Sequence, residues 1–155
     1  MSGGPEDRLA ALGLALPEVP TPAAAYQPWA RSGDLVLTAG QLPVVDGALP
    51  CTGRLGAELQ TAQGAQQART AALNVLAVAA AAAGGLDRVR VVKLTVFVAS
   101  AEGFHEQHLV ANGASELIGE VLGTAGVHAR SAVGVASLPL GAPVEVEAVL
   151  EVSSG

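Results

Sequence analysis

One arginine and three acids that follow it at spacings of two and four residues are the residues of this chain best placed to do chemistry. Only 14% of the 155 residues are charged, yet Arg130 stands alone in an apolar run and is followed by Glu145, Glu147 and Glu151. Alternate residues of a strand share a face, so Glu147 and Glu151 fit a solvated strand face. Glu145 lies beside the LPLGAP turn, where a carboxylate can overhang a cleft. Arg130 can contact either a small ligand or an acid at a subunit interface.

The other polar residues predict neither a metal site nor a cofactor. His105 and His108 fall on one face of a predicted helix, but two nitrogens are too few for a zinc site and no third ligand follows at a recognisable spacing. His128 precedes Arg130 by two residues and either lines the same wall or has a structural role. Cys51 is the only cysteine, which excludes an internal disulfide. The sequence contains no nucleophile elbow, phosphate-binding loop or dinucleotide-binding fingerprint.

Composition and charge limit the classes of partner. The net charge of −6 argues against nucleic-acid binding, because that affinity depends on Lys and Arg neutralising phosphates. A mean hydropathy of +0.45 is high for a monomer of this length, so some apolar surface is expected to meet another subunit. The apolar stretch at residues 73–85 is mostly alanine and too weak to span a membrane, and the acidic N-terminus does not resemble a signal peptide. We therefore expect a cytoplasmic oligomer.

The order of the predicted elements defines the fold class. Helices are predicted at residues 5–13, 61–83 and 104–122, because these segments lack internal proline and each ends at a glycine. Strands are predicted around 26–30, on both sides of an Asp46-Gly47 turn within 34–50, and at 88–100, 131–137 and 144–152, the last two as one hairpin. Two long helices alternate with strands, so the expected fold is an α+β sandwich in a single domain, residues 1–155.

The predicted hairpin keeps Arg130 and Glu145 of one chain apart. If residues 131–152 fold back on themselves, Arg130 lies opposite the far end of the second strand, about six residues from Glu145. That separation is roughly 20 Å at about 3.3 Å per residue. The two side chains can then share a small ligand only if Arg130 of one subunit meets Glu145 of a neighbour, which agrees with the apolar excess.

Three segments resemble the blocks of a known family. They are YQPWARSGDLVLTAGQLP, VVKLTVFV and HARSAVGVASLPLGAPVEVEAVLEV, and the likeness extends from Tyr26 to Val152. The chain is identified by them as similar to the Rid (YjgF-like) family of enamine/imine deaminases, whose members often have the older label endoribonuclease L-PSP or translation inhibitor. This resemblance implies a chorismate mutase-like sheet packed against two long helices, in a homotrimer with ligand clefts between subunits. Residues 1–20 then form a helical extension, residues 21–155 the Rid-like core, and the extension marks a distinct subgroup.

The resemblance also implies roles for individual residues. Arg130 matches the arginine that binds a substrate carboxylate through two hydrogen bonds, a geometry that a guanidinium suits. Glu145 matches the acid that positions the attacking water. Tyr26 matches a tyrosine near the ligand, and Gly40 a glycine whose backbone approaches it. Alternatively, Tyr26 is an ordinary interface residue and Gly40 serves only a bend.

Two further positions in the cleft are implied by the same likeness. Ala132 stands where relatives often have cysteine, and the family uses mainly the backbone there, so this change need not abolish activity. Asn112 matches a cleft asparagine, although the segment before Arg130 is about five residues longer in this chain. Asn112 can also be an ordinary interface residue.

The resemblance makes one activity the leading hypothesis and leaves three alternatives. The leading hypothesis is cofactor-independent hydrolysis of a small enamine or imine of a 2-keto acid, of the 2-aminoacrylate type, to the keto acid and ammonia. Arg130 would anchor the carboxylate and Glu145 would hold the water. The alternatives are a non-catalytic trimer that binds a 2-keto acid, a ribonuclease or translation inhibitor as in the older label, and a purely structural protein.

Overall fold

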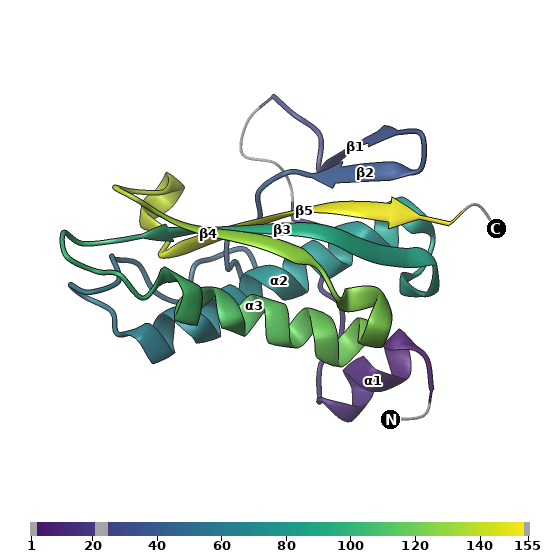
Figure 1. Cartoon of the computed structure of the whole chain (residues 1–155), viewed down its shortest axis with the longest axis horizontal. Helices are drawn as coiled ribbons and strands as arrows, with labels where there is room; N and C mark the ends of the chain where they lie inside the picture. Colours follow the sequence, from purple (N-terminus) through teal and green to yellow (C-terminus); the bar gives the residue numbers. More distant parts are fainter. Residues whose placement is uncertain (1–2, 21–24, 154–155) are drawn as a thin grey trace.

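Two long helices cover one face of a five-stranded mixed sheet (Figure 1). The structure is a computed structural model that describes residues 3–20 and 25–153. Its helices are α1 (Pro5–Ala11), α2 (Thr61–Ala83) and α3 (Gln107–Leu122), and its strands are β1 (Trp29–Ser32), β2 (Leu35–Thr38), β3 (Val89–Ala99), β4 (Ala129–Val135) and β5 (Val144–Val152). The strand order is β1-β2-β5-β3-β4, and only the β3–β4 pair is parallel. The predicted α+β class is confirmed.

Small side chains let the helices lie close to each other and to the sheet. On α2, Ala68, Ala71 and Ala72 are fully buried, because alanine suits both a helix and a close contact. The helix ends as predicted at Gly84, whose φ of 77° is a left-handed conformation that favours glycine. On α3, Gly113 faces α2 so closely that a Cβ there would collide with the carbonyl oxygen of Ala65. Gly113 therefore fixes the separation of the two helices.

The two faces of the sheet differ in burial. On the face covered by the helices, Leu94, Val96, Val146 and Leu150 are fully buried. Residues that alternate with these are half-buried or exposed along β2, β3, β4 and β5. No helix of the described residues lies on that second face, which we call the open face (Figure 1).

The predicted hairpin of the last two strands is wrong. β4 pairs in parallel with β3, and β5 pairs antiparallel with β3 and β2, so β3 lies between the two strands expected to be neighbours. Parallel strands need a long crossover connection, and α3 supplies it between β3 and β4. The LPLGAP segment forms a short 3₁₀ turn at Pro139–Gly141 instead of closing a hairpin. β3, in which all eleven residues except Arg90 and Lys93 are β-branched or apolar, lies between β5 and β4 and is therefore flanked on both sides.

Several smaller expectations also needed correction. The strand expected around residues 26–30 begins at Trp29. The Asp46-Gly47 turn forms, with φ of 51° and 83°, but Val45 and Ala48 beside it make only an isolated bridge and no strands.

A helix that spans a membrane must be both long and apolar. None of the helices within residues 3–20 and 25–153 meets both requirements.

The helix predicted from residue 104 begins at Gln107, because Glu106 is its N-cap: its backbone conformation is not helical, and its carbonyl oxygen accepts from the N–H of Val110. His105 therefore precedes the helix, and the expectation that it shares a helix face with His108 is wrong. Among residues 3–20 and 25–153, no group of three His, Cys, Asp or Glu side chains could hold a metal ion.

The N-terminal extension packs on the far end of the helical layer. Leu9 of α1 is only 3% exposed and belongs to the core. Arg8 Nε donates to the carbonyl oxygen of Val121 at 2.7 Å, and Glu6 accepts from the backbone N–H of Leu86 at 3.4 Å. The helical part of the predicted extension covers Pro5–Ala11 only. The expected boundary between residues 20 and 21 adjoins residues 21–24, which lie outside the described residues.

The contact between α2 and α3 makes a prediction for stability. Gly113→Ala should lower the free energy of unfolding by about 1–3 kcal/mol or more, because its methyl group overlaps the backbone of α2. Gly119→Ala in the same helix should be neutral or stabilise by up to about 1 kcal/mol, since nothing lies within 4 Å of a Cβ there and alanine favours helix. Urea unfolding followed by circular dichroism measures both, and equal midpoints would contradict the close helix contact.

Candidate active site

Arg130 points from the sheet toward α3. In the parallel register it lies opposite Leu94, whose side chain is buried under the helices. Partner residues in a ladder direct their side chains to the same face, so Arg130 also faces the helical layer. It lies on the edge strand of the sheet and stays partly exposed at the side of α3.

Three neutral acceptors on α3 hold the Arg130 guanidinium. Nη1 donates to Asn112 Oδ1 at 2.9 Å and to Ser115 Oγ at 3.1 Å, and Nη2 donates to the backbone oxygen of His108 at 3.2 Å. A guanidinium has five N–H donors. Nε and one hydrogen of Nη2 therefore remain without a partner among the described residues.

The charge of Arg130 has no acid beside it in the described part of the chain. The ion pairs there join Arg69 to Glu120 and Arg90 to Glu151, both at the surface. Neutral acceptors fix the direction of the arginine without neutralising it. This arrangement suits the binding of an anion from outside, most simply a carboxylate in a bidentate contact.

Glu145 faces the opposite side of the sheet. Glu145 lies opposite Phe97 on β3, whereas Arg130 lies opposite Leu94. Phe97 and Leu94 are three residues apart, and residues separated by an odd number along a strand point to opposite faces of the sheet. Burial raises the pKa of the Glu145 carboxyl above its ordinary value, and the carboxylate of Glu147 on the same face raises this pKa further. The raised pKa lets the Glu145 carboxyl exchange a proton at a higher pH than an ordinary glutamate does.

Gly40 makes room for the Glu145 carboxylate. A Cβ at Gly40 would collide with a carboxylate oxygen of Glu145 and lie 2.7 Å from its Cδ. The chain bends here because regular β2–β5 pairing stops after Leu37, and the hydroxyl of Thr38 accepts the N–H of Ala148 at 3.1 Å. A side chain at position 40 would therefore displace the Glu145 carboxyl group from the place that it occupies here.

Gly40 and Tyr26 also line one cavity of about 610 Å³. Pro17–Pro20 of the N-terminal extension form another part of its wall. Tyr26 is 48% exposed, so its ring is accessible to a ligand or to another protein surface. The extension therefore contributes to the surroundings of the predicted site.

The six predicted site residues separate into two groups. Arg130, Asn112 and Ala132 lie on the helical side, where Ala132 is aligned with Val96 and packs against the core. We call these three residues the arginine half-site. The second group is Glu145, Gly40 and Tyr26, which we call the glutamate half-site. Within these groups the structure places Arg130 against Asn112 and Gly40 against Glu145, and Tyr26 shares a cavity with Gly40. The sheet separates Arg130 from Glu145.

Sequence reasoning missed Ser115 and the role of the His108 carbonyl. Residues 108, 112 and 115 follow the i, i+4, i+7 spacing that places side chains on one helix face. That spacing, once Asn112 was suspected, predicts Ser115 beside the same arginine. The His108 contact uses a backbone oxygen, so it could not be predicted from the pattern of side chains.

The sequence and the fold of this chain match a known family. Residues 6–151 match the family model described as "YjgF/chorismate_mutase-like, putative endoribonuclease". The chain therefore belongs to the YjgF/chorismate mutase-like family, and the resemblance to Rid proteins is confirmed. "Protein TCP17" of Trypanosoma cruzi is 49% identical over 155 residues, which cover 99% of this chain and 97% of that protein.

Solved structures resemble this chain with different sequence identities and TM-scores. A protein of unknown function from Agrobacterium tumefaciens is 48% identical with a TM-score of 0.89, over 96% of this chain and 92% of that one. A structure from Shewanella oneidensis described as a "putative endoribonuclease" is 33% identical with a TM-score of 0.94, over 97% and 100%. Escherichia coli TdcF with bound serine is 27% identical with a TM-score of 0.65, over 88% and 94%. The first two matches are long enough to include most of the N-terminal extension.

The crowding of acids on the open face makes a prediction for titration. Glu147→Gln should lower the pKa of Glu145, because a neighbouring negative charge no longer opposes its ionisation. The ¹³C shift of the Glu145 side-chain carboxyl, followed against pH, should then move its midpoint to lower pH. Glu151→Gln is the control, since that carboxylate pairs with Arg90 at 3.3 Å and is not a cause of the raised pKa. An unchanged midpoint in Glu147→Gln would contradict the coupling.

Proposed function

We propose that this protein hydrolyses small enamines or imines that carry a carboxylate, of the 2-aminoacrylate type, to 2-keto acids and ammonia. The reaction takes place in a cleft between subunits of a homotrimer. The observation that carries the proposal is the orientation of Arg130 by three neutral acceptors with two donors left over. Membership of a family whose members are often enamine/imine deaminases supports it.

Arg130 selects the carboxylate of the substrate. Its Nε and Nη2 donors match the two oxygens of a carboxylate, and its fixed direction reduces the ordering that binding would otherwise require. Serine bound to TdcF also carries a carboxylate beside an amino-bearing carbon, as the proposed substrate does. Asn112 and the backbone at Ala132 then form the wall next to the anchored group.

Glu145 assists the addition of water. The enamine first tautomerises to the imine by taking a proton on its terminal carbon. Water then adds to the imine carbon, with one proton passing through Glu145 to the nitrogen, and the C–N bond of the resulting aminoalcohol breaks to release ammonia and leave the keto group. A half-buried carboxyl with a raised pKa suits this transfer of one proton in each direction. No cofactor is needed for these steps.

The cleft is completed by two copies of the chain. Arg130 and Glu145 face opposite sides of one sheet, so a ligand of a few atoms contacts both only where the arginine half-site of one subunit meets the glutamate half-site of another. A contact between two different surfaces closes into a ring when the rotation is right. Leu35, Leu37 and Val133 are 40–46% exposed on the open face and supply apolar area for such an interface. The family resemblance gives three as the number of copies.

The family description also names an endoribonuclease, which the charge of this chain does not favour. The sequence has 8 Lys and Arg residues against 14 Asp and Glu residues. Binding an RNA backbone requires cations that follow its phosphates. A single oriented arginine instead suits one small anion.

Turnover tests the roles of the two charged residues. Ammonia release from 2-aminoacrylate generated in situ should be accelerated by the wild type. Arg130→Ala should raise KM about 10- to 100-fold through loss of a charged hydrogen-bonding group. Glu145→Gln should lower kcat at least about 100-fold while retaining 2-keto acid binding by calorimetry. Arg69→Ala, which removes a surface ion pair, is the matched control. Binding without any wild-type acceleration would favour a non-catalytic trimer.

Mixed oligomers test the shared cleft. Arg130→Ala and Glu145→Gln subunits, co-expressed with different tags, should form hybrids in which some clefts have both native residues. At equal amounts roughly a quarter of the clefts in a random ring are intact, so activity should return to that fraction of the wild type. Light scattering should give three times the 15.3 kDa chain mass. Hybrids as inactive as the separate variants would place the whole site within one chain.

A further inference from the structure

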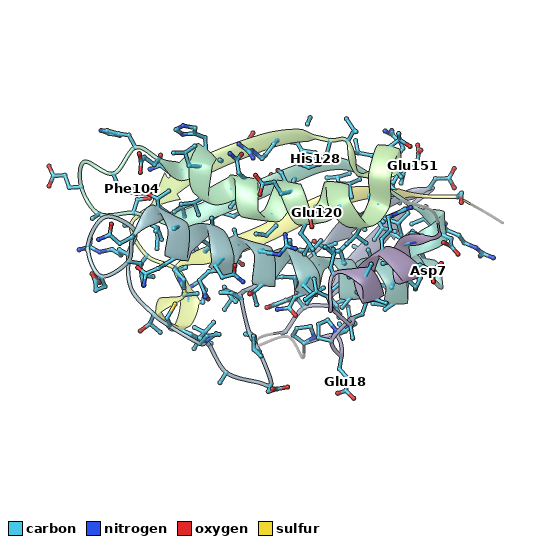
Figure 2. The ribbon with its side chains drawn as sticks, turned by 90° about the horizontal axis from the view of Figure 1, so that it is seen from below. Asp7, Glu18, Phe104, Glu120, His128 and Glu151 are labelled. Atoms are coloured by element: carbon cyan, nitrogen blue, oxygen red, sulfur yellow. The ribbon has the colours of Figure 1, made fainter. Side chains whose placement is uncertain are left out.

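His128 and Ser115 form a hydrogen-bonded pair beside Arg130. His128 Nδ1 lies 2.6 Å from the carbonyl oxygen of Gly126, and its Nε2 lies 2.9 Å from Ser115 Oγ. A carbonyl oxygen only accepts, so Nδ1 must carry the hydrogen in that contact. In the neutral ring Nε2 is then an acceptor, and the hydroxyl of Ser115 donates to it. Figure 2, which looks onto the helical layer, labels His128 beside α3.

The same serine oxygen accepts from the arginine. Arg130 Nη1 donates to Ser115 Oγ at 3.1 Å while the hydroxyl hydrogen of Ser115 is directed at His128. The four groups form one chain of hydrogen bonds, in which Arg130 donates to Ser115, Ser115 donates to His128, and His128 donates to the Gly126 carbonyl oxygen. Hydrogen bonds aligned in one direction strengthen one another. The histidine therefore fixes the hydroxyl so that a lone pair, and not the hydrogen, meets the guanidinium.

The far end of this chain is rigid. Gly126 is buried, and a Cβ there would come within 2.5 Å of the Ile118 carbonyl oxygen, so its backbone lies directly against α3. It belongs to the short turn Gly123–Gly126 that joins α3 to β4. The carbonyl that accepts from His128 is thus held by the connection that positions β4 itself.

We propose that Ser115 and His128 are positioning residues for Arg130, which set the guanidinium so that its Nε and Nη2 donors face the substrate carboxylate. This inference rests on the proposed function, in which Arg130 binds that carboxylate. Neither residue touches the substrate. Three acceptors restrict the orientation of the Arg130 guanidinium. Two are the Asn112 side chain and the His108 carbonyl oxygen, and the third is the Ser115 hydroxyl, which His128 holds in place.

The role predicts an effect on binding rather than on the chemical step. An anchor that holds the carboxylate equally in the ground state and the transition state affects KM and leaves kcat unchanged. Ser115→Ala removes one acceptor of a charged donor, so KM for the imine and Kd for pyruvate should each rise about three- to tenfold. The value of kcat should stay within about twofold of the wild type.

Conservative variants separate positioning from packing. Ser115→Thr keeps the hydroxyl and should remain near the wild type. His128→Gln places an amide oxygen near the position of Nε2 and should also bind normally, whereas His128→Asn reaches only the position of Nδ1 and should match Ser115→Ala. All four variants should show wild-type circular dichroism. Equal effects of His128→Gln and His128→Asn, or a fall in kcat without a change in KM, would overturn the proposal.

A measurement on the arginine itself distinguishes failure of this inference from failure of the proposed function. Rotation about the Nε–Cζ bond of Arg130, followed by ¹⁵N NMR in the ligand-free protein, should be slow in the wild type and in Ser115→Thr and fast in Ser115→Ala. The result does not depend on turnover. If the wild type binds no carboxylate, the proposed function fails but slowed rotation would still support positioning. Rotation unaffected by Ser115→Ala would overturn the positioning role, whatever the activity.

Discussion

The parallel pairing of β4 with β3 is the constraint on which the candidate site depends. Parallel neighbours require a crossover, and the crossover in this chain is α3. The same helix that makes the pairing possible therefore lies directly against the strand that carries Arg130. Its Asn112 and Ser115 side chains and a backbone oxygen reach the guanidinium because topology places them there. The helix α3 therefore both connects β3 to β4 and orients Arg130.

The alternation of side chains across a strand then divides the site. Arg130 and Glu145 are aligned with positions of β3 that differ by three, so the sheet itself lies between them. Each half-site can be well ordered alone: the arginine by neutral acceptors, and the glutamate by the space that Gly40 leaves. Neither half-site contains the charge complementary to its own among the described residues, so within one chain Arg130 and Glu145 do not pair with each other.

Much of the framework was predictable because it depends on local chemistry. Alanine composition and a glycine end defined α2, and a β-branched run defined β3. The hairpin failed because two apolar segments joined by a turn have the same local pattern whether they pair with each other or with a third strand. The separation of Arg130 from Glu145 was anticipated, but through that wrong hairpin, whereas the actual reason is the face reversal. The pairing of Ser115 with His128 depends on a tertiary contact that spacing alone does not specify.

The position of β4 at the edge of the sheet has a consequence for the lone chain. An edge strand presents a row of unpaired backbone N–H and C=O groups that can template pairing with another chain. β4 contains Ala, Ser, Val and Gly around a single Arg, and that arginine is turned toward α3, so no charge on the strand guards its outer margin. A lone chain is therefore exposed to strand-to-strand aggregation along this margin, and an assembly that covered β4, as the proposed trimer would, protects solubility as well as building a site.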